Sequence, residues 1–354
     1  MTMMPPMFDG VVVTAWSGWY VVETASGRLL CRPRGRLRPR VDRHRELRAR
    51  EHAEGLSDPE EPEEEDGEEP TPVETGPRHA RGGGHLEAEA EEPGILAGDR
   101  VHCTDLGGGE GRIEVVLPRA VTLTRPPVAN VDQAIVVTAW TEPPFSPAFV
   151  DRLLVAVARE GCVAAICLNK IDRLEPDQRA QAIADLSPYR MAGYDVLLTS
   201  ARTGEGMAEL AVAVRGKVSV LAGPSGSGKS ALLGRLCPDR PPRSAAISPR
   251  LGRGRHTTRH VELLRVPTEG PPSWVADTPG FSRLDLEGLA PEDLGRYYPE
   301  FLPLADGCRF HGCLHEAEPG CAVIAAVEAG VVDPGRHARY LESLAEVRQH
   351  FRVF

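Results

Sequence analysis

A glycine-rich loop between two apolar segments narrows the choice of fold more than any other part of this sequence. Residues 223–230 read GPSGSGKS, after the apolar segment VSVLA and before ALLGRL. Glycine lets a backbone wrap closely around phosphates, and the amide N–H groups that open a helix face an anion. A strand, this loop and a helix in that order predict a phosphate-binding P-loop in an α/β domain.

The side chains of this loop predict which groups hold the phosphates and a metal ion. Lys229 is expected to reach the β- and γ-phosphates, and the Ser230 hydroxyl to ligate Mg²⁺. Only three of the chain's 41 lysines and arginines are lysines, so a lysine at this position suggests that a compact ammonium is needed. The residues expected at the phosphates are Gly223, Ser225, Gly226, Ser227, Gly228, Lys229 and Ser230.

Two motifs at the ends of apolar strands predict guanine as the base. NKID follows CVAAICL, at the edge where a parallel sheet holds ligands, and resembles the guanine-specificity motif of GTPases. In that motif the carboxylate, here Asp172, accepts two N–H groups of guanine, while Asn169 braces the loop and Lys170 packs over the ring. Ser200 and Ala201 follow another strand and resemble the loop whose backbone meets the guanine carbonyl.

A third motif, DTPG at residues 277–280, follows an apolar segment and resembles the DxxG switch of GTPases. Asp277 would hold Mg²⁺ through a water molecule, and the Gly280 amide would contact the γ-phosphate. The stretch GRGRHTTRH lies between the P-loop and this motif. A threonine there would complete the Mg²⁺ shell, and Thr258 is preferred to Thr257.

These motifs stand in an unusual order along the chain. GTPases typically run from the P-loop through the threonine and DxxG to NKxD and Ser-Ala, whereas here NKID and Ser-Ala come first. The order predicts a circularly permuted GTPase domain over residues 130–291. Its alternating strands and helices predict a parallel sheet with helices on both faces.

Ahead of this domain, residues 9–37 and 95–119 alternate apolar and polar residues between glycine turns. Several short strands without helices predict an oligonucleotide-binding (OB-fold) β-barrel over residues 1–129. Trp16, Trp19 and Tyr20 could stack on bases, although aromatic residues also suit the core of a barrel. The barrel is therefore a candidate RNA-binding module.

A segment of biased composition, about residues 38–93, interrupts the barrel pattern. Residues 51–92 include the acidic run EEPEEEDGEEP and carry a net charge of −14, which leaves the rest of the chain mildly basic at +4. Such a segment cannot bury enough apolar surface to fold, so we expect a disordered insertion. The insertion is either a solvated loop without a function or a shield over a basic RNA-binding surface.

Three of the eight cysteines cluster late in the chain, in the pattern Cys-x4-Cys-x-His-x5-Cys. Three thiolates and one imidazole suit a single tetrahedral, structural Zn²⁺. His311 is the alternative to the histidine in this pattern. We expect a helical zinc-binding domain over residues 292–354. The predicted zinc ligands are Cys308, Cys313, His315 and Cys321.

The other five cysteines are scattered, which excludes a secreted disulfide framework and favours a reducing cytoplasm. No apolar run approaches the roughly 18 residues that span a bilayer, and the N-terminus lacks the pattern of a signal peptide. We therefore expect a cytoplasmic, monomeric protein with no membrane partner.

The motif order, NVDQ ahead of the permuted domain, GRHTT, and CRFHGC-x-H-x5-C together resemble the RsgA family of circularly permuted GTPases. The resemblance spans nearly the whole chain except about residues 38–93, which depart from the family pattern. It implies an N-terminal OB-fold, a permuted GTPase domain and a C-terminal zinc-bearing domain. It also implies late maturation of the small ribosomal subunit, contact with that subunit and its rRNA, and GTP hydrolysis to GDP that the subunit stimulates.

The catalytic machinery has one irregularity. Many GTPases place a glutamine just after DxxG to orient the attacking water, and here that position is Phe281. Slow intrinsic hydrolysis is therefore expected. In keeping with the resemblance, His256 is the candidate for positioning water, and Lys229 and Thr258 are the other expected catalytic residues.

Three other functions are weaker interpretations. NKID argues against a P-loop kinase or ATPase, and nucleotide competition separates these from a GTPase. Phe281 keeps open a non-catalytic RNA-binding module regulated by a nucleotide. A metal-bound interaction scaffold leaves the GTPase motifs unexplained and ranks last.

Overall fold

The part of the chain that the structure describes contains most of the predicted elements. The computed structural model describes residues 7–16, 18–37, 94–124, 126–239, 261–281, 286 and 288–351. The predicted insertion, His256, Thr257 and Thr258 lie outside these residues, as do the side chains of residues 278–281. The chain divides into two units, residues 1–36 with 95–354 and residues 37–94, and the elements below belong to the first.

Five N-terminal strands close into a barrel. They pair in the order β1-β2-β3-β5-β4, and β4 pairs back onto β1. All neighbours are antiparallel except β3 and β5, and the result is the OB-like barrel that the sequence predicts. The strands are β1 (Met7–Trp16), β2 (Trp19–Thr24), β3 (Gly27–Pro33), β4 (Arg100–Gly107) and β5 (Glu110–Val116).

Alternating residues of these strands fill the barrel. Val12, Val22 and Ile113 are fully buried. Tyr20 is also buried, so it belongs to the core rather than to a base-stacking surface. Trp19 is half-buried, and the Arg32 guanidinium lies 3.9 Å from the centre of its ring.

Two short strands lie between the barrel and the central sheet. They are β6 (Thr122–Thr124) and β7 (Pro127–Ala129), which pair antiparallel and which the sequence did not predict. Within NVDQ, the Asn130 amide donates to the Gly98 carbonyl over 2.9 Å. The Asp132 carboxylate accepts the Val218 N–H over 2.7 Å. Asp132 therefore holds the start of the central sheet, whereas Asn130 connects this segment to the residues just before β4.

A mostly parallel sheet follows, in the order β10-β9-β8-β11-β13-β12. The first five strands are parallel, and β12 is an antiparallel strand beside β13 that the sequence did not predict. Thr14 of β1 pairs with Glu262 of β12, so barrel and central sheet are continuous. The strands are β8 (Gln133–Thr138), β9 (Val163–Leu168), β10 (Asp195–Leu198), β11 (Val218–Ala222), β12 (Glu262–Val266) and β13 (Ser273–Phe281).

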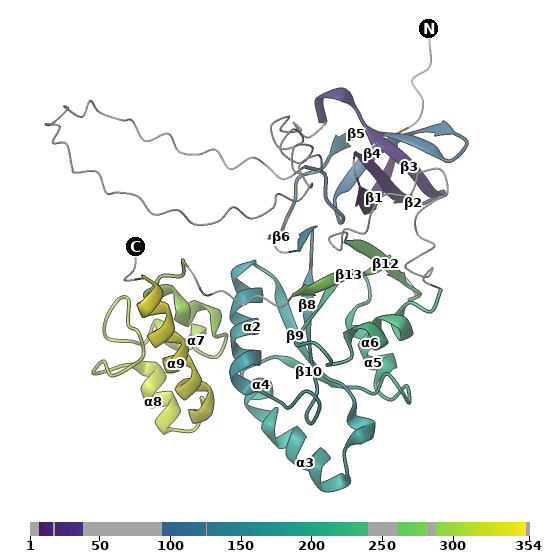
Figure 1. Ribbon diagram of the computed structural model, residues 1–354. Coiled ribbons are helices and arrows are strands. Elements are labelled where there is room, and N and C mark those ends of the chain that lie inside the picture. Colours follow the sequence, from purple (N-terminus) through teal and green to yellow (C-terminus); the bar gives the residue numbers. More distant parts are fainter. Residues whose placement is uncertain are drawn as a thin grey trace, which may run out of the picture. The chain divides into compact units, whose positions relative to one another are not determined.

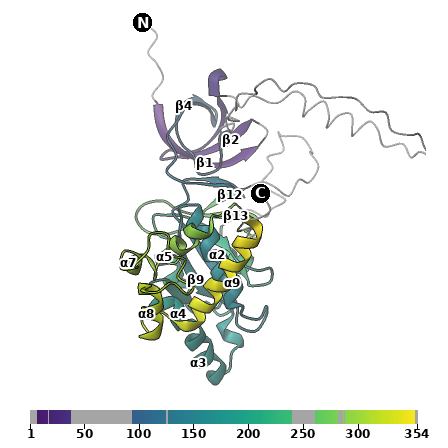
Figure 2. The ribbon, with the colours of Figure 1, turned by 90° about the vertical axis from the view of Figure 1, so that its left-hand side faces the viewer.

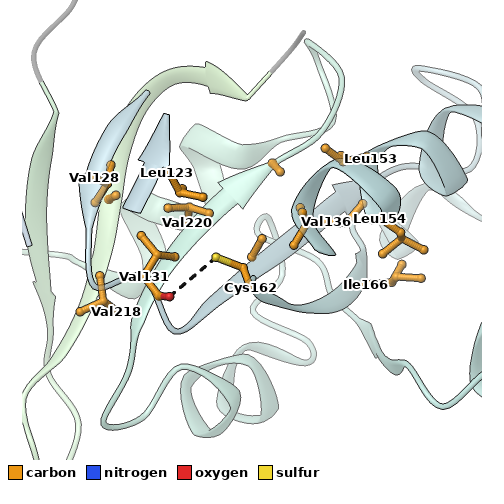
Figure 3. Close-up of a cluster of buried hydrophobic side chains, with 14 of the residues drawn as sticks. Leu123, Val128, Val131, Val136, Leu153, Leu154, Cys162, Ile166, Val218 and Val220 are labelled. Atoms are coloured by element: carbon orange, nitrogen blue, oxygen red, sulfur yellow. Dashed lines mark hydrogen bonds between the residues drawn. The ribbon is translucent and has the colours of Figure 1, made fainter. Parts of the chain in front are cut away.

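Helices cover both faces of this sheet (Figure 1), as predicted. Ile135 and Val136 are neighbours in β8 but belong to separate cores, because successive side chains of a strand point to opposite faces. Figure 3 shows Leu153 and Leu154 of α2 in the core that contains Val136. The helices are α2 (Pro147–Arg159), α3 (Pro176–Asp185), α4 (Ser187–Met191), α5 (Met207–Ala213) and α6 (Lys229–Leu236), with the 3₁₀ turn η2 (Ile171–Arg173).

The C-terminal part is helical, and its core also includes Val155 of α2. Tyr298, Phe301 and Tyr340 pack ring against ring, with centroids 5.0 to 5.1 Å apart. Figure 2 shows α9 beside α2. Among the described helices, none has both the length and the apolar character to cross a membrane. The elements are η3 (Pro291–Tyr297), α7 (Leu302–Ala305), α8 (Ala322–Glu328) and α9 (Pro334–Phe351).

Candidate nucleotide-binding and metal-binding sites

The P-loop connects β11 to α6 at the carboxyl edge of the sheet. Gly223 has φ 137° and lies directly against the Val137 carbonyl of β8, where a side chain would collide. Gly228 has φ 97° and lies against the Asn169 side-chain amide. Only glycine tolerates both the left-handed backbone and these close approaches. The glycines of the motif therefore let the loop pack against β8 and NKID.

Lys229 is the first residue of α6 and reaches back over the loop. Its Nζ donates to the carbonyl oxygens of Gly223 and Pro224, both over 2.8 Å. Partial burial lowers the pKa of its ammonium, because a less polar environment disfavours charge. Ser230 is exposed on the next helical position. The ammonium and this hydroxyl belong to the first two residues of α6. They therefore lie at its N-terminal end, the end of a helix that attracts an anion.

Asn169 brings three separated motifs together. It is 2% exposed, and its Nδ2 donates to the Ser227 carbonyl of the P-loop over 2.9 Å. Its Oδ1 accepts the Ala201 N–H over 3.2 Å and the Thr199 hydroxyl over 3.3 Å. One amide thus connects NKID to the P-loop and to the Ser-Ala loop. The Ser227 hydroxyl is buried and has no hydrogen-bond partner within the described residues.

Lys170 is held beside the P-loop by a residue that the sequence analysis did not identify. Its backbone is left-handed, with φ 65°, and its Nζ donates to the Glu142 carbonyl over 2.8 Å. The Glu142 carboxylate pairs with Arg173 over 3.0 Å. The segment after β8 therefore forms one side of the candidate base site.

Asp172 is held by two donors from the Ser-Ala loop. The Ser200 hydroxyl donates to Oδ1 over 2.5 Å, and Arg202 Nε donates to Oδ2 over 2.6 Å. The Ser200 hydrogen bond, more than any other contact, lowers the pKa of the Asp172 carboxyl. The carboxylate is therefore charged near neutral pH, as an acceptor for guanine N–H groups must be.

The candidate switch lies beside the P-loop. β13 runs parallel to β11, and Ala222, just before the P-loop, pairs with Phe281, just after DTPG. Asp277 pairs across the other edge of β13 with Glu262. The backbone thus brings Asp277 and Gly280 to the strand next to the phosphate loop. The other expected residues of this region, His256, Thr257 and Thr258, lie outside the described residues.

The late cysteines and His315 form a second candidate site. Cys308 Sγ lies 3.9 Å from Cys321 Sγ and 3.7 Å from His315 Nδ1, and His315 Nδ1 lies 3.3 Å from Cys321 Sγ. Together with Cys313, the four ligand atoms lie within 4.8 Å of one another. A tetrahedral ion bound at Zn–S and Zn–N distances of about 2.0–2.3 Å has ligand atoms roughly 3.5–3.8 Å apart. The cluster could therefore bind such an ion.

The surroundings of this cluster favour His315 over His311. His315 is buried, with a left-handed backbone of φ 56°, whereas His311 is exposed and not part of the cluster. Burial lowers the pKa of His315, which keeps its imidazole neutral, the form that ligates a metal. The Glu318 carboxylate accepts the backbone N–H groups of Leu314 and Glu316, each over 2.9 Å. This residue, which the sequence did not single out, orders the loop that carries His315.

Comparisons with known proteins decide the family. The family model described as RsgA GTPase matches residues 116–287. A protein of Moorella thermoacetica named small ribosomal subunit biogenesis GTPase RsgA is 48% identical over 264 residues, which cover 75% of this chain and 89% of that protein. The chain belongs to the RsgA family. An RsgA of the same name from Shouchella clausii is 37% identical over 98% of this chain and 100% of its own length.

Two solved structures resemble the whole chain. YjeQ from Thermotoga maritima has a TM-score of 0.69 and 29% identity, covering 97% of this chain and 99% of its own. YloQ, described as a circularly permuted GTPase, has a TM-score of 0.70 and 30% identity, covering 99% and 98%. As a member of the RsgA family, the chain is a GTPase, an enzyme that hydrolyses GTP. GTPases use Mg²⁺ with their nucleotide.

Proposed function

We propose that this protein binds the small ribosomal subunit and acts late in its maturation, hydrolysing GTP to GDP and phosphate at a rate that the subunit stimulates. The position of Asn169 carries the GTPase part of this proposal, because this amide joins three GTPase motifs in one site. The name shared by the curated relatives, small ribosomal subunit biogenesis GTPase, supports the choice of partner.

The base-binding half of the proposed site is built from NKID and the Ser-Ala loop. Asp172 accepts guanine N–H groups, and Ser200 and Arg202 hold its carboxylate in place. Asn169 braces the loop, and Lys170 lies along the base. Backbone N–H groups of the loop that contains Ala201 meet the guanine carbonyl.

The phosphate-binding half is the P-loop with the switch. Lys229 moves from the loop carbonyls to the β- and γ-phosphates, which are stronger acceptors for its ammonium. Ser230 and Thr258 ligate Mg²⁺, with Asp277 contributing through water, and the ion neutralises phosphate charge. The Gly280 amide contacts the γ-phosphate. The backbone groups around the phosphates belong to Gly223, Ser225, Gly226, Ser227 and Gly228.

Water attack on the γ-phosphate needs a group that orients the water. Phe281 has no hydrogen-bonding group in its side chain, so hydrolysis by the free protein is slow. His256 positions the water once the subunit is bound. In this proposal His256→Ala lowers the subunit-stimulated rate, and equal rates in the variant and the wild type would remove the assignment.

The three parts of the chain have separate roles in this proposal. Residues 1–129 form the OB-fold domain that contacts rRNA, interrupted by the insertion at about 38–93. Residues 130–291 form the permuted GTPase domain. Residues 292–354 form a domain held by one Zn²⁺ on Cys308, Cys313, His315 and Cys321. In this proposal the protein works as a monomer, in the cytoplasm, where its partner is the small subunit.

Sedimentation with purified ribosomal subunits tests the proposal. The full chain, with a non-hydrolysable GTP analogue, is expected to sediment with small subunits, and GDP in place of the analogue is expected to weaken the association. Large subunits are the matched control. Failure to sediment with small subunits with either nucleotide, or equal sedimentation with large subunits, would overturn it.

A further inference from the structure

Arg235 connects the phosphate-binding helix to the loop expected to meet the base. It lies in the last turn of α6, the helix that starts at Lys229. Its Nε donates to the Ala201 carbonyl over 2.8 Å, and its Nη2 donates to the Arg202 carbonyl over 2.7 Å. The planar guanidinium thus binds two successive carbonyls of the Ser-Ala loop, a geometry that lysine cannot reproduce.

This fork supplies the Ser-Ala loop with an anchor from outside the loop. Most other hydrogen bonds of the loop are local, such as Ser200 N–H to the Glu205 carbonyl over 2.9 Å and Gly204 N–H to the Ser200 carbonyl over 2.8 Å. The Ala201 N–H is bound on its inner side by Asn169. Arg235 holds the carbonyls of the next two peptides, whose N–H groups are those of Arg202 and Thr203. The Thr203 N–H donates to the Ser200 hydroxyl over 3.0 Å, so Arg235 fixes where the Arg202 N–H points.

Arg202 acts on the same loop through its side chain. Its Nε pairs with the Asp172 carboxylate, which is 6% exposed, while the Arg202 side chain is 74% exposed. Ser200 holds the second oxygen of this carboxylate. The side chain of Arg202 therefore orients the carboxylate, while its backbone carbonyl is held by Arg235.

We propose that Arg235 and Arg202 are positioning residues that divide guanine selectivity between two edges of the base. Arg235 fixes the peptide between Ala201 and Arg202, whose N–H meets the oxygen at position 6. Arg202 fixes the Asp172 carboxylate that accepts the amino group at position 2. The proposal rests on the proposed base site, and it assigns separate parts of that site to residues outside the motifs.

Two guanine analogues separate the two edges. IDP lacks only the 2-amino group, whereas 6-thio-GDP keeps the N–H groups and replaces the oxygen at position 6 by sulfur, a weaker acceptor. All three nucleotides share the same diphosphate, so the ratio of two dissociation constants cancels the phosphate contribution. Binding of GDP, IDP and 6-thio-GDP to the full chain therefore reports each edge separately.

Arg235→Ala is expected to lower the preference for GDP over 6-thio-GDP by about three- to tenfold, the worth of a neutral hydrogen bond. The preference for GDP over IDP should stay close to that of the wild type. Arg202→Ala is expected to lower the preference for GDP over IDP by about tenfold, because the acceptor that it displaces, the Asp172 carboxylate, is charged. The preference for GDP over 6-thio-GDP should then stay close to that of the wild type. Arg235→Lys, which can bind one carbonyl, should give an intermediate loss.

The outcomes distinguish the inference from the proposed function. Arg190→Ala is the matched control, because this arginine is exposed and its side chain makes no hydrogen bond within the described part of the chain. Unchanged ratios in Arg235→Ala and Arg202→Ala, or an equal loss of affinity for all three nucleotides, would overturn the inference. A wild type without preference for GDP over ADP would instead refute the proposed base site. If Arg235→Ala does not fold, Arg235→Lys decides by the same ratios.

Discussion

Arg336 of α9 donates to the Asp151 carboxylate of α2 over 2.6 Å, and each side chain is almost completely buried. Arg336 also pairs with Glu300 over 2.7 Å. Its guanidinium lies 5.0 to 5.7 Å from the ring centres of Tyr189, Tyr194 and Tyr298. The C-terminal helix is thus joined to the central domain by a buried ionic cluster inside an aromatic cage.

Replacing Arg336 should strongly destabilise the protein. Arg336→Met keeps apolar volume but leaves Asp151 and Glu300 buried with fewer partners, which costs about 3–5 kcal/mol when one member of a buried pair is removed. Urea unfolding followed by tryptophan fluorescence measures the change. Arg296→Ala is the control, since its pair with Asp293 is exposed and contributes less than about 1 kcal/mol. Equal losses in the two variants would contradict the account.

The cluster of three cysteines with His315 leads to different predictions for two histidines of one loop, His315 and His311. The proposed zinc ligands predict that His315→Ala reduces the zinc content of the purified chain from one ion to a small fraction. His311→Ala should leave it unchanged, because His311 is exposed outside the cluster. Loss of the ion should lower the stability of the C-terminal part by several kcal/mol, since binding energy is folding energy in such sites. Elemental analysis and thermal unfolding check both effects. Zinc retained in His315→Ala would contradict the ligand set.

Lys217 directly precedes β11, and Lys229 lies in the P-loop at the other end of that strand. Lys229→Ala should weaken GTP binding about 10- to 100-fold, because a charged hydrogen bond contributes about 1.5–3 kcal/mol. Lys217 donates to the Gln133 side chain over 2.9 Å, away from the P-loop. Lys217→Ala should therefore leave GTP affinity unchanged. Titration with a fluorescent GTP analogue measures both, and similar affinities in the two variants would remove Lys229 from the phosphate site.

Asp172→Asn should change the preferred base. An amide offers a donor where guanine needs an acceptor at position 2, whereas xanthine carries a carbonyl there. GTP affinity should fall about 10- to 100-fold, the worth of a hydrogen bond to a charged group, while XTP affinity rises. Competition between the two nucleotides measures the shift. A variant that keeps the wild-type preference for GTP would show that NKID does not contact the base.

The motifs could be predicted because each is a local pattern with a clear physical meaning. GPSGSGKS predicts its own turn, and NKID ends a strand whose apolar run marks it as buried. Residues outside the motifs, which hold a motif loop or a helix in place, could not be predicted in this way. Arg235 acts through backbone carbonyls 33 and 34 residues away, and Arg336 pairs with Asp151 across 185 residues. In a chain rich in arginine, nothing local distinguishes these from the others.

Some parts of the fold were also beyond local patterns. β12 is only five residues long, Glu262–Val266, and it is defined by its neighbours β13 and β1 rather than by its own sequence. The NVDQ segment carries polar residues that suggest a linker, yet Asn130 and Asp132 bind backbone groups from distant elements. Tyr20 suits both a core and a nucleic-acid surface by type, and only the closed barrel decides between them.

GTP turnover by the purified full chain, with and without small ribosomal subunits and with ATP as control, tests the central claim most directly. The account predicts slow GTP hydrolysis by the free chain and a strong increase with small subunits, with no comparable increase for ATP. A chain that binds GTP but hydrolyses it at the same rate with and without small subunits would contradict the account.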